Sequence, residues 1–158
     1  MAASKQVNEF YAQWFPTIQS FARLYLADED EGAAAAVQAF CEYMRTGLPF
    51  ETDELPLVLW ECAAESVQGR AFITNAYGRM PKSCDKGTEF DKAVMLLNSD
   101  ERLAFLLHMV YGLPPGWVML ITGWSARTVV ALCEAGAVQV SRALRLSPMR
   151  RARLTTRV

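Results

Sequence analysis

The sequence predicts an all-α protein made of two small helical domains. Apolar residues recur at spacings of three and four over long stretches, as on the buried face of an amphipathic helix. No segment shows the two-residue alternation of a strand ladder. Charge is also uneven: residues 1–97 carry 8 basic and 14 acidic side chains, whereas residues 98–158 carry 8 arginines and 3 acidic side chains. Such asymmetry favours two modules with different partners.

Composition places the chain among globular proteins. Its 158 residues are 52% hydrophobic and 21% charged, which is enough apolar material for a core and excludes a disordered chain. No apolar run approaches the roughly 18 residues needed to cross a bilayer, and the sequence does not open on a secretory signal. We therefore expect a cytoplasmic protein that does not act in a membrane.

Three helices are expected in a first domain that spans residues 5–77. Apolar and aromatic side chains at helical spacing predict each of them, and the acidic residues 28–31 suit the start of the second. Pro56 is expected in the first turn of the third, where proline is tolerated. The expected helices are 7–26, 28–45 and 53–76.

A second domain is expected over residues 88–147. It follows a linker at residues 78–87, which holds two glycines and one proline without helical period, and it precedes a basic tail at residues 148–158. Ser99 and Ser125 are the expected N-caps of two of its helices. The expected helices are 90–97, 99–111, 115–122 and 126–146.

The last two of these helices have the order of a helix-turn-helix. Gly123 interrupts the chain between them, and Ser125 can cap the helix that follows. In a helix-turn-helix that binds DNA, the second helix lies in the major groove.

Eight short motifs follow one another in order between residues 8 and 145. They are Phe10–Pro16, Leu24–Leu26, Val37–Phe40, Leu57–Trp60, Asp100–Leu107, Tyr111–Leu113, Ile121–Ser125 and Thr128–Val129. In order and spacing they resemble the extracytoplasmic-function (ECF) sigma factors of bacterial RNA polymerase.

The resemblance implies a first domain like sigma region 2 and a helix-turn-helix like sigma region 4. Its implied partners are core RNA polymerase or an anti-sigma-type protein, with promoter DNA as a ligand if the helix-turn-helix reads it. The implied DNA contacts are Arg127, Thr128, Arg142 and Arg145. The implied contacts to polymerase or another protein are Gln38, Phe40, Glu42, Val130 and Leu132.

Two surfaces of the first domain lack the charges that this resemblance requires. The family carries acids on its second helix to bind basic groups of polymerase, and this chain has Ala33–Ala36 there. The family's promoter-melting helix carries cations and asparagine, and this chain has Glu61 and Glu65, which repel a polyanion. Docking and melting by these surfaces are therefore not supported by charge.

The expected recognition helix departs in the same way. Family members place cations after the position of Thr128–Val129, whereas residues 130–135 contain none. Val130, Leu132 and Val138 are apolar residues beyond those needed for the stripe that faces the core, and exposed apolar residues usually mark a protein contact.

Two functions therefore stay open. The first is a sigma-type initiation protein that docks on RNA polymerase and contacts promoter DNA through the helix-turn-helix. The second is a sigma mimic that does not read DNA and binds an anti-sigma or other regulatory protein. The arginines of the basic tail are either a solubilising end or nonspecific phosphate contacts.

Catalytic and metal chemistry have little support in the sequence. No nucleophile accompanies a base and no glycine-rich phosphate loop occurs, so we expect neither an enzyme nor a cofactor. The cysteines form no metal-binding pair, and we interpret them as small buried apolar residues. His108, the lone histidine, is expected on a helix surface or hydrogen-bonded in the core.

Overall fold

A computed structural model of the protein describes residues 2–50, 56–76 and 88–146. Within these ranges the chain is helical and contains no strand, so the predicted all-α fold class is confirmed. The expected linker at 78–87, the tail at 148–158, the helix start near Asp53 and Cys84 lie outside the described residues. Contacts divide the chain into two compact units, residues 1–82 and 83–158, which are described separately.

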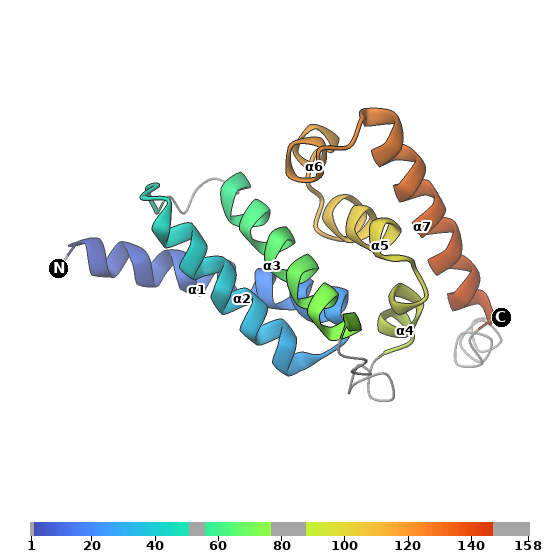
Figure 1. Ribbon diagram of the computed structural model, residues 1–158, viewed down its shortest axis with the longest axis horizontal. Coiled ribbons are helices and arrows are strands. Elements are labelled where there is room, and N and C mark those ends of the chain that lie inside the picture. Colours follow the sequence, from blue (N-terminus) through green and yellow to red (C-terminus); the bar gives the residue numbers. More distant parts are fainter. Residues whose placement is uncertain (1, 51–55, 77–87, 147–158) are drawn as a thin grey trace, which may run out of the picture. The chain divides into compact units, whose positions relative to one another are not determined.

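The described residues of unit 1 form three helices, which can be followed in Figure 1. They are α1 (Ala2–Leu26), α2 (Glu29–Arg45) and α3 (Leu57–Ala76). Helix α1 begins five residues earlier than its apolar stripe predicted, because a helix can extend into solvent past the residues that pack. Helix α3 begins after Pro56 rather than with Pro56 in its first turn, and the Pro56 carbonyl accepts the Trp60 amide at 3.2 Å.

The core of unit 1 is aromatic on α1 and small on α2. Phe21 of α1 meets the fully buried Trp60 of α3 edge-on, with 5.4 Å between ring centroids. Helix α2 contributes Ala35, Ala36 and Ala39, which let its backbone approach both neighbours. At Gly32 the approach is closest: a Cβ there would lie 2.7 Å from the backbone of Arg23 on α1.

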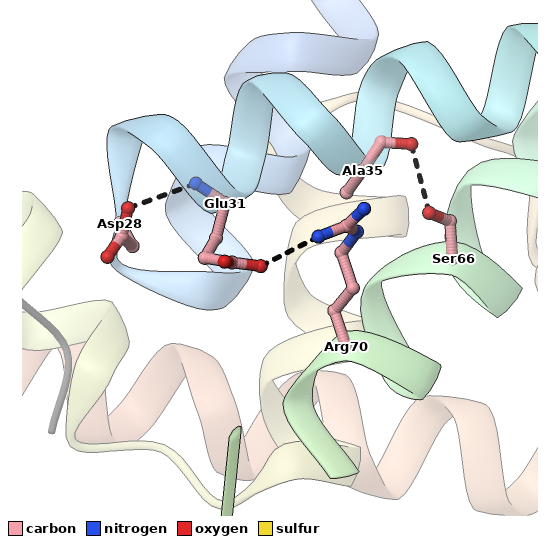
Figure 2. A network of polar contacts seen from close by, with 5 residues as sticks. All are labelled: Asp28, Glu31, Ala35, Ser66 and Arg70. Carbon is pink, nitrogen blue, oxygen red and sulfur yellow. Dashed lines mark hydrogen bonds and ion pairs between the residues drawn. The ribbon is translucent and has the colours of Figure 1, made fainter. Parts of the chain in front are cut away.

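A polar network joins α2 to α3 (Figure 2). Asp28 caps α2, as its place in the acidic corner predicted, by accepting the Glu31 amide at 3.0 Å. The Glu31 carboxylate in turn accepts from Arg70 of α3 at 2.8 Å. About one turn along α2 from Glu31, the hydroxyl of Ser66 donates to the Ala35 carbonyl at 2.9 Å. These bonds fix α3 against α2 at two levels.

Unit 2 places four shorter helical segments against one long helix. The segments are α4 (Glu89–Met95), α5 (Ser99–Ala104), the π-helix η1 (Phe105–Val110) and α6 (Pro115–Thr122), and the long helix is α7 (Ala126–Leu146). Each of the four packs on α7 or on a segment that does. Val129, Cys133, Gly136 and Val140 form the buried stripe of α7, as its spacing predicted.

Two local expectations for unit 2 are corrected. Asn98, not Ser99, caps α5, because its side-chain oxygen accepts the Glu101 amide at 2.9 Å, three residues on. The expected single helix 99–111 is α-helical only to Ala104 and then widens into η1, where the Tyr111 amide donates to Leu106 five residues back. His108 is hydrogen-bonded as expected: its Nδ1 donates to the Leu113 carbonyl at 2.8 Å, since a carbonyl can only accept.

The interpretation of the cysteines is correct in one case and wrong in another. Cys133 is buried in unit 2 and Cys62 is half-buried on α3, but Cys41 is exposed on α2. Cys41 lies on the outward face of its helix, one turn from the exposed Val37 and Met44, so helical position overrides its apolar character.

No single helix in the described ranges is long and apolar enough to cross a membrane, and α6 and α7 meet that criterion only when taken together as a pair bent by 105°.

Candidate functional site

Helices α6 and α7 form the helix-turn-helix that the sequence predicted. Gly123 ends α6 in the left-handed conformation, with φ of 76°, which glycine adopts without strain. Ser125 then caps α7, since its hydroxyl accepts the Thr128 amide at 3.2 Å. The two helix axes differ in direction by 105°. The second helix of the motif is therefore in place, and its outward side chains decide what it can bind.

The outward face of α7 is mostly apolar and small where a recognition helix would meet DNA. Val130 is 50% exposed and Val138 is 55% exposed, although neither is needed for the buried stripe. Ala131 and Glu134 lie between them on the same exposed side. Leu132 is half-buried rather than exposed. No residue from 130 to 138 can donate a charged hydrogen bond to a base or phosphate.

The arginines expected to contact DNA lie at opposite ends of α7. Arg127 is exposed in its first turn, whereas Arg142 and Arg145 are exposed near its C-terminus. At the rise of an α-helix, Arg127 and Arg142 are separated by roughly 22 Å. Thr128, also exposed, shares a 2.9 Å hydrogen bond with the Ser125 hydroxyl, so its side chain already belongs to the helix cap. The structure does not bring these four residues into one cluster.

The outward face of α3, which resembles a promoter-melting helix, is acidic. Glu65 is exposed and Glu61 half-exposed on this side. Burial, and after it the carboxylates of Glu65, Glu42 and Glu61, together raise the pKa of the Cys62 thiol from 9.0 to about 11. A field that disfavours a thiolate also disfavours a nucleic-acid strand. Arg70, the one cation in the sequence of α3, is paired with Glu31.

Trp60, at the start of the same helix, cannot take part in base stacking. Its side chain is fully buried and packs against Phe21 in the core of unit 1. Stacking on a flipped base would require an exposed aromatic face. The tryptophan that strengthened the resemblance is therefore a core residue in this chain.

The residues expected to bind a partner through α2 have different environments. Gln38 and Glu42 are exposed, and Glu42 is paired with Arg45 at 2.6 Å. Phe40 is only 5% exposed. It lies under a groove of about 200 Å³ between α1 and α2, whose lining is entirely apolar. The groove is lined by Val7, Phe10, Tyr11, Val37, Phe40, Cys41, Met44 and Phe50.

Sequence reasoning missed this groove, which we call the α1–α2 groove. The exposed positions Val37, Cys41 and Met44 recur at spacings of four and three, and that was the available signal. The same spacing also fits a buried stripe, so the sequence could not separate the two. No group of three or more metal-ligating side chains occurs within the described ranges.

No family model matches the sequence, and comparison with curated proteins gives no match. Among solved structures, the chain is similar to the sigma factor RpoE of Bartonella quintana, determined in complex with the anti-sigma factor NepR. The TM-score is 0.69 over 87% of this chain and 95% of RpoE, at 14% sequence identity. The chain has the fold of a sigma factor.

The sigma-factor fold confirms what the eight sequence motifs implied about architecture. The fold is shared at 14% identity, as expected when volume and patterning rather than particular side chains determine packing. The charged surfaces are not part of that framework. What this sigma-like chain binds therefore depends on the side chains on α2, α3 and α7.

Proposed function

We propose that this protein is a sigma-like regulator of transcription initiation that binds a protein partner and does not read promoter sequence. The exposed apolar face of α7, with Val130 and Val138 about half exposed, carries the proposal. A helix that reads DNA presents donors and acceptors to base edges. A helix that binds protein presents apolar surface.

The acidic face of α3 supports the same function. Glu61 and Glu65 lie one turn apart on α3, where Glu65 is exposed and Glu61 half-exposed. At physiological salt, two carboxylates repel phosphates instead of releasing counterions. Buried Trp60 offers no stacking surface. Neither promoter melting nor upstream readout therefore has the chemistry it needs in the described residues.

The chemistry of the partner follows from the fold and from α7. RpoE, which shares this fold, is found in complex with an anti-sigma factor, and this supports a partner of that type. Arg127, Arg142 and Arg145 are exposed at the two ends of the apolar face. A partner helix with apolar residues at its centre and acids towards its ends would complement that pattern. In this proposed function, the sigma-like protein itself acts in the cytoplasm and performs no catalysis.

A second candidate function is a sigma factor that docks on core polymerase and contacts promoter DNA. Exposed Arg127 in the first turn of α7 favours it, since the N-terminal residues of a recognition helix are those that meet base edges. The intact turn at Gly123 favours it as well. One arginine supplies at most a single bidentate base contact, so selectivity would be low.

Binding measurements on the full chain separate the two functions. We expect a stable complex with an anti-sigma-type protein of the same organism, weakened about tenfold by Val130→Gln with Val138→Gln. The matched control is Leu96→Gln, which alters an exposed apolar residue on α4's C-cap. Sequence-selective binding to duplex DNA that Arg127→Ala abolishes would overturn the proposal and establish the second function.

A further inference from the structure

We infer that unit 2 binds the surface of an anionic lipid bilayer, through the exposed apolar side chains of η1 and α6 and the arginines that follow them in the sequence. This inference goes beyond the proposed function and does not rest on it. It assigns a contact surface separate from the apolar face of α7. The helices lie on the bilayer in this proposal and do not cross it.

Charge is segregated along unit 2. Residues 103–126 contain no aspartate, glutamate, lysine or arginine, and they form the end of α5, η1, α6 and the turn before α7. Residues 127–158 contain seven arginines and one glutamate. An uncharged apolar stretch beside a polybasic one is a pattern of proteins that bind anionic lipid, because either signal alone gives only weak attachment.

Helix α6 exposes an apolar surface that packing within unit 2 does not need. Its eight residues are all uncharged, and Val118 is the one that is buried. Leu120 is 67% exposed, and Trp117 and Ile121 are half-buried. A core helix that is apolar on all sides is normally buried on all sides. Helix α6 therefore has an apolar outer side that an apolar partner can cover.

The π-helix η1 extends this surface. Met109 is 53% exposed and Val110 is 37% exposed near its end, and η1 contacts α6. The Nδ1 of His108 donates to the Leu113 carbonyl at 2.8 Å, which fixes the turn between the two segments. The surface formed by η1 and α6 is therefore already ordered before anything binds to it, which lowers the entropic cost of binding.

Aromatic side chains and hydropathy favour a lipid bilayer as the partner. Trp117 and Trp124 are half-buried near the two ends of α6, and tryptophan is enriched where proteins meet the bilayer interface. Taken together, α6 and α7 are apolar enough for a membrane span. Burial in a core does not account for this hydropathy in α6, where only Val118 is buried.

The geometry of the helix pair suits a position in the bilayer interface. Helices α6 and α7 are bent by 105° relative to each other, so they do not form one straight span. Helix α6 alone is about 12 Å long, less than half of the roughly 30 Å of the hydrocarbon core. A helix in the interface buries its apolar side chains at the level of the headgroups and keeps its other face in water.

The arginines select anionic over zwitterionic lipid. Arg127 is exposed in the first turn of α7, three residues after Trp124. Each basic side chain near an anionic surface strengthens the attraction to it. Residues 148–158, whose structure lies outside the described residues, contain no acidic residue and four arginines, which are Arg150, Arg151, Arg153 and Arg157.

Lipid vesicles test the inference on the full chain. We expect the protein to sediment with vesicles of phosphatidylcholine and phosphatidylglycerol in equal parts, and not with vesicles of phosphatidylcholine alone. Met109→Gln with Leu120→Gln should weaken binding about tenfold without any change in protein charge. Arg150→Gln with Arg151→Gln should weaken it about thirtyfold at low salt, and added salt should reduce that difference.

Matched variants in unit 1 separate this surface from general stickiness and net charge. Val37→Gln with Met44→Gln alters two exposed apolar residues and should leave vesicle affinity unchanged. Lys5→Gln with Arg45→Gln removes as much positive charge as the arginine pair does, from exposed positions of unit 1, and should have little effect. Circular dichroism of each variant checks that its helices are intact.

Tryptophan fluorescence locates the contact. Brominated phosphatidylglycerol should quench the fluorescence of the bound protein, and most of this quenching should vanish when Trp117→Phe is combined with Trp124→Phe. Trp60 is fully buried in unit 1 and should not be quenched. Quenching that survives the two substitutions would place the lipid on another surface and would contradict the inference.

Three further outcomes would overturn the inference. They are no binding to anionic vesicles, equal binding to both kinds of vesicle, and binding to anionic vesicles that Met109→Gln with Leu120→Gln leaves unchanged. A protein complex that the same pair disrupts, without vesicle binding, would assign the surface to a protein instead.

Failure of this inference and failure of the proposed function are distinguishable. Val130→Gln with Val138→Gln should weaken the protein complex formed through α7 and leave vesicle affinity unchanged. Met109→Gln with Leu120→Gln should do the reverse.

Discussion

The hydroxyl of Ser66 on α3 donates a buried hydrogen bond to the carbonyl oxygen of Ala35 on α2, with 2.9 Å between the two oxygens (Figure 2). The two residues are 31 positions apart in the sequence. Ser66 is the one buried polar or charged side chain among those described. Its bond therefore fixes the rotation of α3 relative to α2, and with it the direction in which Glu61 and Glu65 point.

Replacing Ser66 with alanine should lower the free energy of unfolding. The substitution removes one buried hydrogen bond without leaving an unpaired donor, so we expect a loss of about 1 kcal/mol. Denaturant titration followed by circular dichroism measures it. Ser141→Ala, at an exposed position on α7, reports the effect of helix propensity alone. Equal stability of the two variants would show that the Ser66 bond contributes nothing.

Gly32→Ala and Gly69→Ala should change stability in opposite directions. At Gly32 a new Cβ would lie 2.7 Å from the backbone of Arg23, which cannot move as a side chain can, so we expect a loss of about 1–3 kcal/mol. At Gly69 on α3 the added methyl meets open space. There we expect a gain of about 0.5–1 kcal/mol from lower backbone entropy in the unfolded chain. Thermal unfolding of both variants measures the two changes in stability. A Gly32→Ala variant as stable as the parent protein would contradict the close approach of α2 to the backbone of Arg23.

The described cysteines should react with a thiol reagent in the order Cys41, Cys62, Cys133. Cys41 is exposed, whereas Cys133 is buried and its pKa is raised by burial. The pKa of Cys62 is raised to about 11, first by burial and then by Glu65, so its rate should climb about tenfold per pH unit towards that value. Mass spectrometry of a Cys84→Ser chain after timed alkylation gives the order. The Glu65→Gln substitution should raise the alkylation rate of Cys62. An unchanged rate would contradict the contribution of the Glu65 carboxylate to its pKa.

The same thiol predicts weaker folding at alkaline pH. Its pKa is about 11 in the folded chain against an ordinary 9.0, so the folded state holds the proton more tightly than the unfolded state. The resulting contribution to stability is complete below pH 9 and is lost as pH rises through 11. Unfolding of the Cys62→Ser variant should depend less on pH in this window. If the stability of the parent protein and of the Cys62→Ser variant depended on pH identically, the loss of stability at alkaline pH would come from other groups.

Residual affinity for duplex DNA should be weak, dependent on salt and indifferent to sequence. Arg142→Ala with Arg145→Ala should reduce the slope of log affinity against log salt by about 2, because each removes at most one phosphate contact. Arg127→Ala should not alter the preference between a random duplex and a promoter-like one. A selective loss on the promoter-like duplex would identify Arg127 as a base contact.

The local signals along the chain determined the helices of both units. Gly123 and Ser125 end one helix and start the next through backbone conformation and capping, which need only neighbouring residues. The sequence predicted Ser99 as the N-cap of α5, whereas the cap is Asn98, one residue earlier. Local rules allow this error because either side chain can accept a hydrogen bond from a backbone amide of the first turn. The widening of the chain into η1, which packs against α7, had no local signal in the sequence.

The sequence by itself determined the all-α class, the approximate positions of the helices and the mismatch between a sigma-like framework and its surface charges, because helical periodicity, capping and charge are properties of short stretches. Tertiary structure decided which apolar residues face solvent. Val130 and Leu132 are two positions apart, yet Val130 is exposed and Leu132 is half-buried. The α1–α2 groove exists because Tyr11 and Val37, 26 residues apart in the sequence, meet across two helices. Such a surface depends on how the faces of α1 and α2 meet, and periodicity within either helix does not specify it.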